Sequence, residues 1–200
     1  MRSRSSIRAQ AGFSILELMV VIVLIGIMAT MMAPAVTDAL ADRNTNQAAI
    51  DMVRLVRRAR AETIGYGRAH VLSFVNDSGV GTALLFRGVT TNCNQNNWDA
   101  ILAADCSSAM CVDSVDMAAD EYEIGDNTVS LTSNFGDSGQ LCFQPNGATL
   151  WRAAAGSRFS ETLPAGEAIQ FSLQRAFDDE LVGVARTIVL PPGGDPRIMR

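Results

Sequence analysis

The most regular feature of the sequence is an unbroken apolar run close to its start. Residues 13–36 read FSILELMVVIVLIGIMATMMAPAV, and Glu17 is the only charged residue among them. A helix rises about 1.5 Å per residue, so this run is long enough to cross a hydrocarbon core of about 30 Å. We therefore predict a membrane-spanning helix over residues 13–36.

Beyond this run, apolar residues recur at helical spacing and predict an amphipathic continuation. The predicted apolar stripe consists of Ala49, Met52, Val53, Val56, Ala59 and Thr63, and the other faces carry Arg54, Arg57, Arg58 and Ala61. Gly65 and Gly67 bracket the predicted end of the helix, as is common at helix C-termini. We expect the stripe to pack on a globular head. We interpret the arginines as a solvated face that pairs with acidic groups of the head, with a partner-binding strip as the alternative.

After Gly67 the pattern changes to short strands separated by turns. The predicted strands cover residues 70–75, 81–86, 129–131, 140–144, 149–152, 168–175 and 185–190. The first two flank the turn Asn76–Gly79 and read as a hairpin. Because no helical pattern separates the strands, we predict an antiparallel β-sheet and an α+β fold. Residues 91–126 are expected to form a variable loop.

Charge is divided along the chain. Arg2, Arg4 and Arg8 give the first twelve residues +3, and the −5 of the whole chain therefore leaves −8 for the residues after Gly12. A basic start before an apolar run predicts that the N-terminus stays in the cytoplasm. The acidic remainder of the chain is then expected on the opposite side of the membrane. An acidic body also argues against broad nucleic-acid binding, which requires phosphate-neutralising cations.

Four cysteines, an even number, lie on the predicted outer side of the membrane: Cys93, Cys106, Cys111 and Cys142. This usage favours disulfides, with free thiols as the alternative. A zinc site is a further alternative, but no C-x-x-C occurs and the only histidine, His70, is distant in the sequence. Four cysteines allow three pairings, and the sequence does not choose among them.

Glu17 is the residue that an ordinary membrane anchor does not explain. It stands five residues into the apolar run, where an acid costs roughly 2.5–3.5 kcal/mol and is usually functional and paired. One alternative is that Glu17 lies at the membrane interface. Another is a cleaved signal peptide, for which residues 39–41 (Ala-Leu-Ala) offer a small-residue site. Neither alternative accounts for the Gly12-Phe13 junction.

The stretch from Gly12 to Glu17, GFSILE, resembles the processing signal of type IV pilins and type II secretion pseudopilins. The resemblance implies that a prepilin peptidase cuts after Gly12 and that the new N-terminal Phe13 is N-methylated. In a filament, Glu17 of one subunit would neutralise the cationic amine of Phe13 on its neighbour, because a buried charge requires a partner. Pro34 falls where many members of the family carry a helix-kinking proline.

The same resemblance implies a pilin-like organisation of the chain. Residues 1–12 are a cleaved leader, and residues 13–65 are the N-terminal helix. Its first half, 13–36, is transmembrane, and its second half, 37–65, is amphipathic. Residues 66–200 form a periplasmic β head. The protein is then a single-pass protein of the bacterial inner membrane with a cytoplasmic N-terminus.

Three further segments resemble the minor pseudopilin H of type II secretion and the related FimT family. They are residues 57–62 (RRARAE), residues 142–147 (CFQPNG) and residues 187–194 (TIVLPPGG). This resemblance implies a subunit of a periplasmic pseudopilus that helps to export folded proteins, with other pilins, the peptidase and the inner-membrane assembly platform as partners. The alternatives are a minor pilin for pilus assembly, adhesion or DNA uptake, and an anchored or secreted β-domain binding protein.

Six acids crowd one segment of the predicted loop: Asp113, Asp116, Asp120, Glu121, Glu123 and Asp126. Calcium prefers such oxygen ligands, but the spacing is not that of an EF-hand. An acidic loop of this kind is usually solvated, so we expect no metal site.

No sequence feature predicts catalysis or a cofactor. The chain has no G-x-S-x-G elbow and no P-loop, and we expect His70, which begins a strand, to be structural. Arg197 and Arg200 make the end of the chain basic beside Asp195. Two arginines on an acidic head would make few phosphate contacts, so nucleic acid is not an expected partner.

Overall fold

A computed structural model describes residues 14–77, 80–102, 106–123, 126–136, 138–160, 168–178, 180–191 and 194–199. The chain divides into two compact units, Met1–Asp38 and Ala39–Arg200. Helix α1 (Ile15–Tyr66) contributes residues to both units. The boundaries that we expect for the leader, helix and head stay predictions.

The second half of α1 is buried as its periodicity predicts. Every residue of the predicted stripe, from Ala49 to Thr63, is at most 7% exposed, and Arg54, Arg57, Arg58 and Ala61 are exposed or half-exposed on the other faces. Thr63 is tolerated in the core because its hydroxyl donates to the Ala59 carbonyl. The helix ends at Tyr66, and Gly67 follows with φ +62°, a left-handed conformation that glycine adopts without steric cost.

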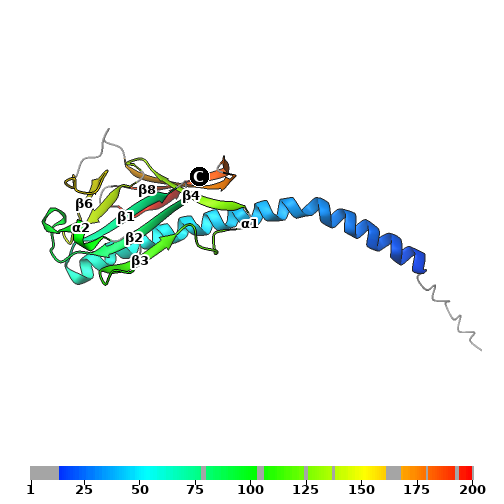
Figure 1. The fold of residues 1–200 in the computed structure, drawn as a ribbon, viewed down its shortest axis with the longest axis horizontal. Helices are drawn as coiled ribbons and strands as arrows, with labels where there is room; N and C mark the ends of the chain where they lie inside the picture. Colours follow the sequence, from blue (N-terminus) through cyan, green and yellow to red (C-terminus); the bar gives the residue numbers. More distant parts are fainter. Residues whose placement is uncertain are drawn as a thin grey trace, which may run out of the picture. The chain divides into compact units, whose positions relative to one another are not determined.

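The head is built on one antiparallel sheet. Its strands are β1 (His70–Asp77), β2 (Val80–Arg87), β3 (Cys111–Asp116), β4 (Asn127–Ser133), β5 (Gln140–Phe143), β6 (Thr149–Arg152), β7 (Ile169–Phe177), β8 (Glu180–Leu190) and β9 (Arg197–Met199). The spatial order is β6-β5-β1-β2-β4-β7-β8-β9, and β3 also pairs with β2. The β1–β2 hairpin has the predicted position. Figure 1 shows the strands gathered along the second half of α1. The α+β, pilin-like fold class is thereby confirmed.

The main core lies between α1 and one face of the sheet. Met52 and Val56 of α1 belong to the same buried cluster as Leu72 of β1 and Phe171 of β7. Successive side chains of a strand point to opposite faces, so Val71 belongs to a second cluster on the other face of β1. The second cluster consists of Ala69, Val71, Cys93, Trp98, Cys142, Leu150 and Phe159. Both faces of β1 are therefore covered.

Our prediction of a loop for residues 91–126 is wrong. This segment contains the 3-10 turn η1 (Cys93–Gln95), the short helix α2 (Trp98–Ile101) and strand β3. The Asn92 side chain caps η1 by accepting a hydrogen bond from the Asn94 amide, and β3 is held by its pairing with β2. These elements are too short and too irregular in burial to give a periodic pattern, which is why the sequence did not indicate them.

His70 begins β1 and is fully buried. Its Nδ1 lies 3.1 Å from the Thr63 hydroxyl and 3.1 Å from the Arg68 carbonyl oxygen. Among the described residues, Nε2 has no hydrogen-bond partner. Burial lowers the pKa of His70 below its ordinary value; the Arg68 carbonyl and Glu62 oppose this shift, and Arg87 adds to it. This shift favours the neutral form of the imidazole at neutral pH, as expected of a structural histidine.

We expect Phe171→Ala to lower the free energy of unfolding by about 3–5 kcal/mol, because it empties a buried site. Phe171 is 0% exposed, and its ring centroid lies 4.6 Å from that of Phe74. Phe177→Ala is the matched control, since Phe177 is in the same strand but 44% exposed; its cost should stay below about 1 kcal/mol. Urea unfolding of the full chain in detergent measures both, and equal losses would contradict the placement of the core.

His70→Asn should remove one component of the pH dependence of stability. Below about pH 6.5 an unfolded histidine binds a proton that the buried one does not, so wild-type stability falls as the pH drops. The free energy of unfolding falls by about 1.4 kcal/mol for each pH unit between the pKa of the unfolded state and that of the folded state. Below the folded-state pKa it levels off. Urea midpoints measured from about pH 7.5 to about pH 5 should therefore fall more steeply in wild type than in the variant. Parallel curves would show that His70 is not held neutral.

Candidate functional site

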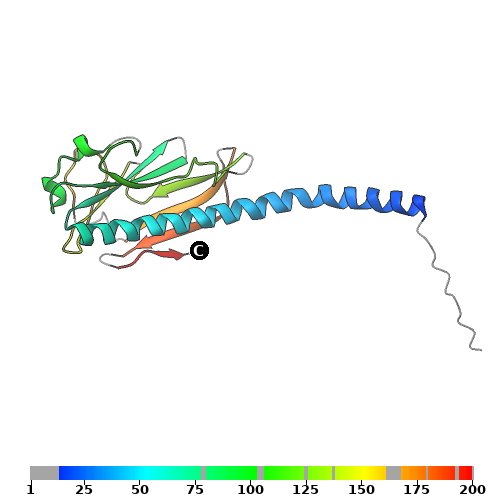
Figure 2. The same cartoon turned by 90° about the horizontal axis from the view of Figure 1, so that it is seen from below.

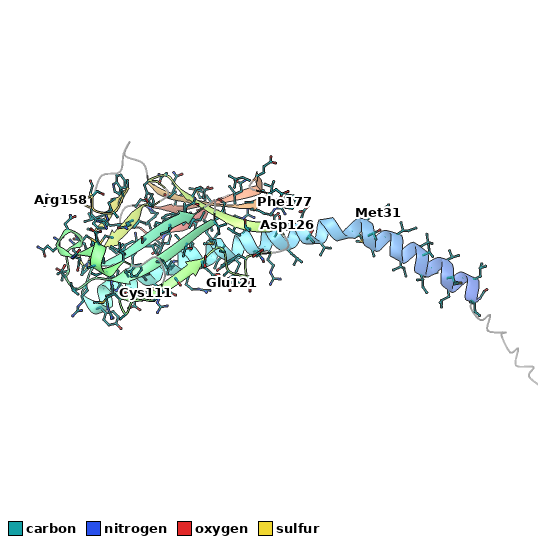
Figure 3. The ribbon with its side chains drawn as sticks, in the orientation of Figure 1. Met31, Cys111, Glu121, Asp126, Arg158 and Phe177 are labelled. Atoms are coloured by element: carbon teal, nitrogen blue, oxygen red, sulfur yellow. A yellow bond between two sulfur atoms is a disulfide. The ribbon has the colours of Figure 1, made fainter. Side chains whose placement is uncertain are left out.

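The first unit presents a bare apolar helix surface. From Ile15 to Met32, each large apolar side chain is at least 45% exposed; Figure 3 labels Met31 on this part of α1. Within the described residues, α1 is the one helix that is long and apolar enough to cross a membrane, by length and composition. An apolar helix surface of this size requires lipid or other helices as its surroundings.

Glu17 lies in the first turn of α1 and is exposed among these apolar side chains. In the part of the chain that the structure describes, its carboxylate has no ion pair. In lipid or between helices, such a carboxylate would require a cationic partner. A position in the first helical turn also suits an acid, because the helix dipole is positive there.

Gly12 and Phe13, the predicted cleavage and methylation positions, lie outside the described residues. Pro34 lies within α1, which continues through this position. The roles of Gly12, Phe13 and Glu17, and the kink at Pro34, stay predictions.

The structure pairs the four cysteines as two disulfides, Cys93–Cys142 and Cys106–Cys111, with Cα atoms 6.0 and 5.3 Å apart. Cys93 and Cys142 are fully buried and tie η1 to β5 inside the second cluster. The other bond closes a short loop before β3; Figure 3 labels Cys111 at the start of that strand. No group of three metal-ligating side chains is found within the described residues.

The acidic segment borders α1. Part of it is strand rather than loop, because Asp113 and Asp116 lie in β3. A hollow of about 340 Å³ between this segment and α1 is lined by Gln47, Asp51, Arg54, Leu55, Asp113, Ser114, Val115, Asp116, Glu121 and Tyr122. Arg58 forms an ion pair with Asp113 at 2.6 Å, so this arginine pairs with the acidic head as we expected.

Tyr122 and Asp51 form a link that the sequence did not reveal. The Tyr122 hydroxyl donates to Asp51 Oδ2 at 3.0 Å, and Gln47 donates to the same oxygen at 2.8 Å. Burial, followed by the hydrogen bond to Asp51, raises the pKa of Tyr122 well above its ordinary value. The partners are 71 residues apart, and no local pattern joins them. This link attaches the acidic segment to the helix.

The basic end of the chain also lies along α1. Arg197 and Ile198 of β9 line a hollow of about 550 Å³ together with Ile50, Val53, Arg54, Arg57 and Pro196. Figure 2 shows β9 running beside α1. Arg60 lies nearby, with its guanidinium 5.7 Å from the Phe143 ring centroid and hydrogen-bonded to the Gly194 carbonyl. Burial lowers the pKa of Arg60, and Asp195 opposes this shift.

Comparison with protein families gives one match. Residues 7–33 match the model of the prokaryotic N-terminal methylation motif, a region that contains Gly12, Phe13 and Glu17. Comparisons with curated proteins and with solved structures gave no significant match. The motif implies processing by a prepilin peptidase and assembly with other pilins, and with the apolar helix it fits a membrane-anchored single-pass protein. The chain therefore carries the N-terminal signal of type IV pilin-like proteins, which supports its place in the pilin and pseudopilin superfamily.

Proposed function

We propose that the protein is a minor pseudopilin of a type II secretion system, cut after Gly12, methylated at Phe13 and assembled through α1 into a periplasmic filament. The observation that carries the proposal is the exposed apolar helix with Glu17 in its first turn, inside the matched methylation motif. Before assembly the helix would anchor the chain in the inner membrane with the head in the periplasm.

Glu17 would act in assembly by charge pairing. Cleavage after Gly12 leaves a cationic amine on Phe13, and in an apolar filament interior that charge is stable only beside an anion. Glu17 of a neighbouring subunit would supply the anion. Misaligned helices would leave both charges unpaired, so the pair would favour one register.

The assignment to the minor pseudopilin H and FimT type rests on a contact between the three segments that resemble this family. Arg60 belongs to the segment 57–62, Phe143 to 142–147 and Gly194 to 187–194. The Arg60 guanidinium stacks over the Phe143 ring and donates to the Gly194 carbonyl. Segments far apart in the sequence thus form one contact, which supports reading them together as one family feature.

We infer a structural, non-enzymatic role, because the match is to a signal for processing and assembly. In secretion, such a filament would help to move folded proteins outward through surface contacts of its heads. The alternative within the superfamily is a minor pilin that serves pilus assembly, adhesion or DNA uptake. An anchored or secreted β-domain binding protein is the alternative from another class.

The mature N-terminus tests the class. In cells that contain prepilin peptidase, mass spectrometry should find a chain that begins at N-methylated Phe13, and cells without the peptidase should retain Met1. Glu17→Ala should leave this cleavage intact but lower the filament-associated protein at least about tenfold, because an unpaired buried charge costs several kcal/mol. Thr30→Ala is the control in the same helix, since the Thr30 hydroxyl bonds only within its own turn. A start at Asp42, or an uncut chain in both strains, would make this an ordinary exported or anchored protein.

A deletion strain distinguishes secretion from the pilus alternative. Loss of the protein should retain folded exoproteins in the periplasm while surface pili stay at the wild-type level, and the full chain supplied in trans should restore export. Proteomics of the culture medium and electron microscopy of the same cells measure the two effects. Normal export with a loss of pili would assign the protein to the pilus system instead.

A further inference from the structure

The second half of α1 exposes a narrow ridge with a hollow on each side. Ile50, Arg54, Arg57 and Ile64 are exposed along this ridge. Arg54 lines both the hollow beside β3 and the hollow beside β9. The two hollows are therefore neighbours across one helix, and each is open to a partner that approaches from its own side.

The hollow beside β3 is acidic, and we name it the acidic flank: Asp51, Asp113, Asp116 and Glu121, with Asp120 adjoining in sequence. Two of these carboxylates are paired within the chain, Asp51 with Arg54 and Asp113 with Arg58. Across the described ranges, Asp116, Asp120 and Glu121 make no ion pair. Figure 3 labels Glu121 on this side of the head. The flank therefore retains negative charge that no cation of the described chain neutralises.

The hollow beside β9 has the opposite character, and we name it the basic flank: Arg54, Arg57 and Arg197 around Ile50, Val53, Pro196 and Ile198. Neither Arg57 nor Arg197 has an ion-pair partner in the part of the chain that the structure describes. Arg197 is fixed in position because β9 pairs with β8 at Val189. Ile50 and Ile198 are 39% and 38% exposed, so apolar contact area accompanies the charge.

We propose that the acidic flank of one copy of this chain docks against the basic flank of a second copy, with their α1 helices side by side and parallel. Helices anchored in one membrane are parallel. Among parallel arrangements, opposite charges meet when the second copy stands beside the first in the same orientation. If the second copy were turned by half a revolution about its own helix axis, acidic flank would meet acidic flank or basic flank would meet basic flank, and like charges repel.

Each copy carries one flank of each sign, so a contact of this kind leaves one flank free on either side for the next subunit. Head-to-tail contacts between unlike surfaces form rings or open filaments and do not close as a two-fold dimer. A nucleic acid fits the basic flank less well, because the acidic flank adjoins it across Arg54 and the chain after Gly12 carries −8. This inference rests on the proposed function, since it describes the neighbour of a filament subunit.

The test is a charge swap between two full-length copies with different tags, produced together in cells. The first copy carries a photo-crosslinking amino acid at Ile198, within the basic flank. Irradiation should join it to a wild-type second copy. Reversal of either flank alone, Arg57→Glu with Arg197→Glu in the first copy or Asp120→Arg with Glu121→Arg in the second, should lower the cross-linked product about tenfold, as expected for loss of close charge pairs.

Combining the two reversals should restore the cross-link, because the charges are again opposite. A misfolded variant could not be rescued in this way. Arg158→Glu in the first copy is the matched control, since it reverses an exposed arginine outside both flanks; it should leave the cross-link unchanged. Equal cross-linking in all pairs, or no recovery in the combined pair, would overturn the proposal.

Two readouts from the same cells separate this contact from the proposed function. Mass spectrometry of the N-terminus and the Glu17 dependence of filament association report on assembly. If both behave as expected but the flank reversals have no effect, the flank contact is wrong and the proposed function stands. Loss of the cross-link when isolated membranes are treated with nuclease before irradiation would mean that a nucleic acid bridges the copies, and it would also overturn the contact.

Discussion

Burial of the apolar stripe of α1 against one face of the sheet is the interaction on which the rest of the head depends. Met52, Val56 and Ala59 supply a continuous surface to which β1, β2, β5 and β7 contribute the opposite side. Most of the stability of a helix in a protein comes from the packing of its amphipathic face, and a sheet with a large exposed apolar face is an aggregation liability. Each element therefore stabilises the other, and the strands take their order around the helix.

The same helix meets two different environments along its length. Up to Met32 its large side chains are exposed, whereas from Ala48 its stripe is covered by the head. A surface that is apolar on all sides suits lipid or a bundle of like helices, and a one-sided stripe suits a globular domain. The chain thus carries its anchor and the spine of its head in one element, and the role of the protein follows from what each part is packed against.

A second layer completes the sheet on the face away from α1. The disulfide Cys93–Cys142 joins η1 to β5, and Trp98 and Phe159 pack beside it. Trp98 donates its indole N–H to the Cys93 carbonyl, which satisfies the one polar group of that side chain. Through this layer, irregular segments that have no hydrophobic periodicity of their own become part of the core.

The sequence by itself determined the apolar run, the buried face of α1, the β1–β2 hairpin and the unusual position of Glu17. These features depend on hydrophobic periodicity, on turn residues and on the free-energy cost of one acidic side chain in an apolar run. All three can be read from a short stretch of sequence. It did not determine β3, α2, the disulfide pairing, the Tyr122–Asp51 link or the opposite charge of the two flanks. Asp113, Asp116 and Glu121 read only as an acidic segment, and Arg57 and Arg197 are 140 residues apart in the chain. The tertiary structure decided where they lie, because packing β3 and β9 on opposite sides of one helix is a long-range outcome that no local pattern encodes.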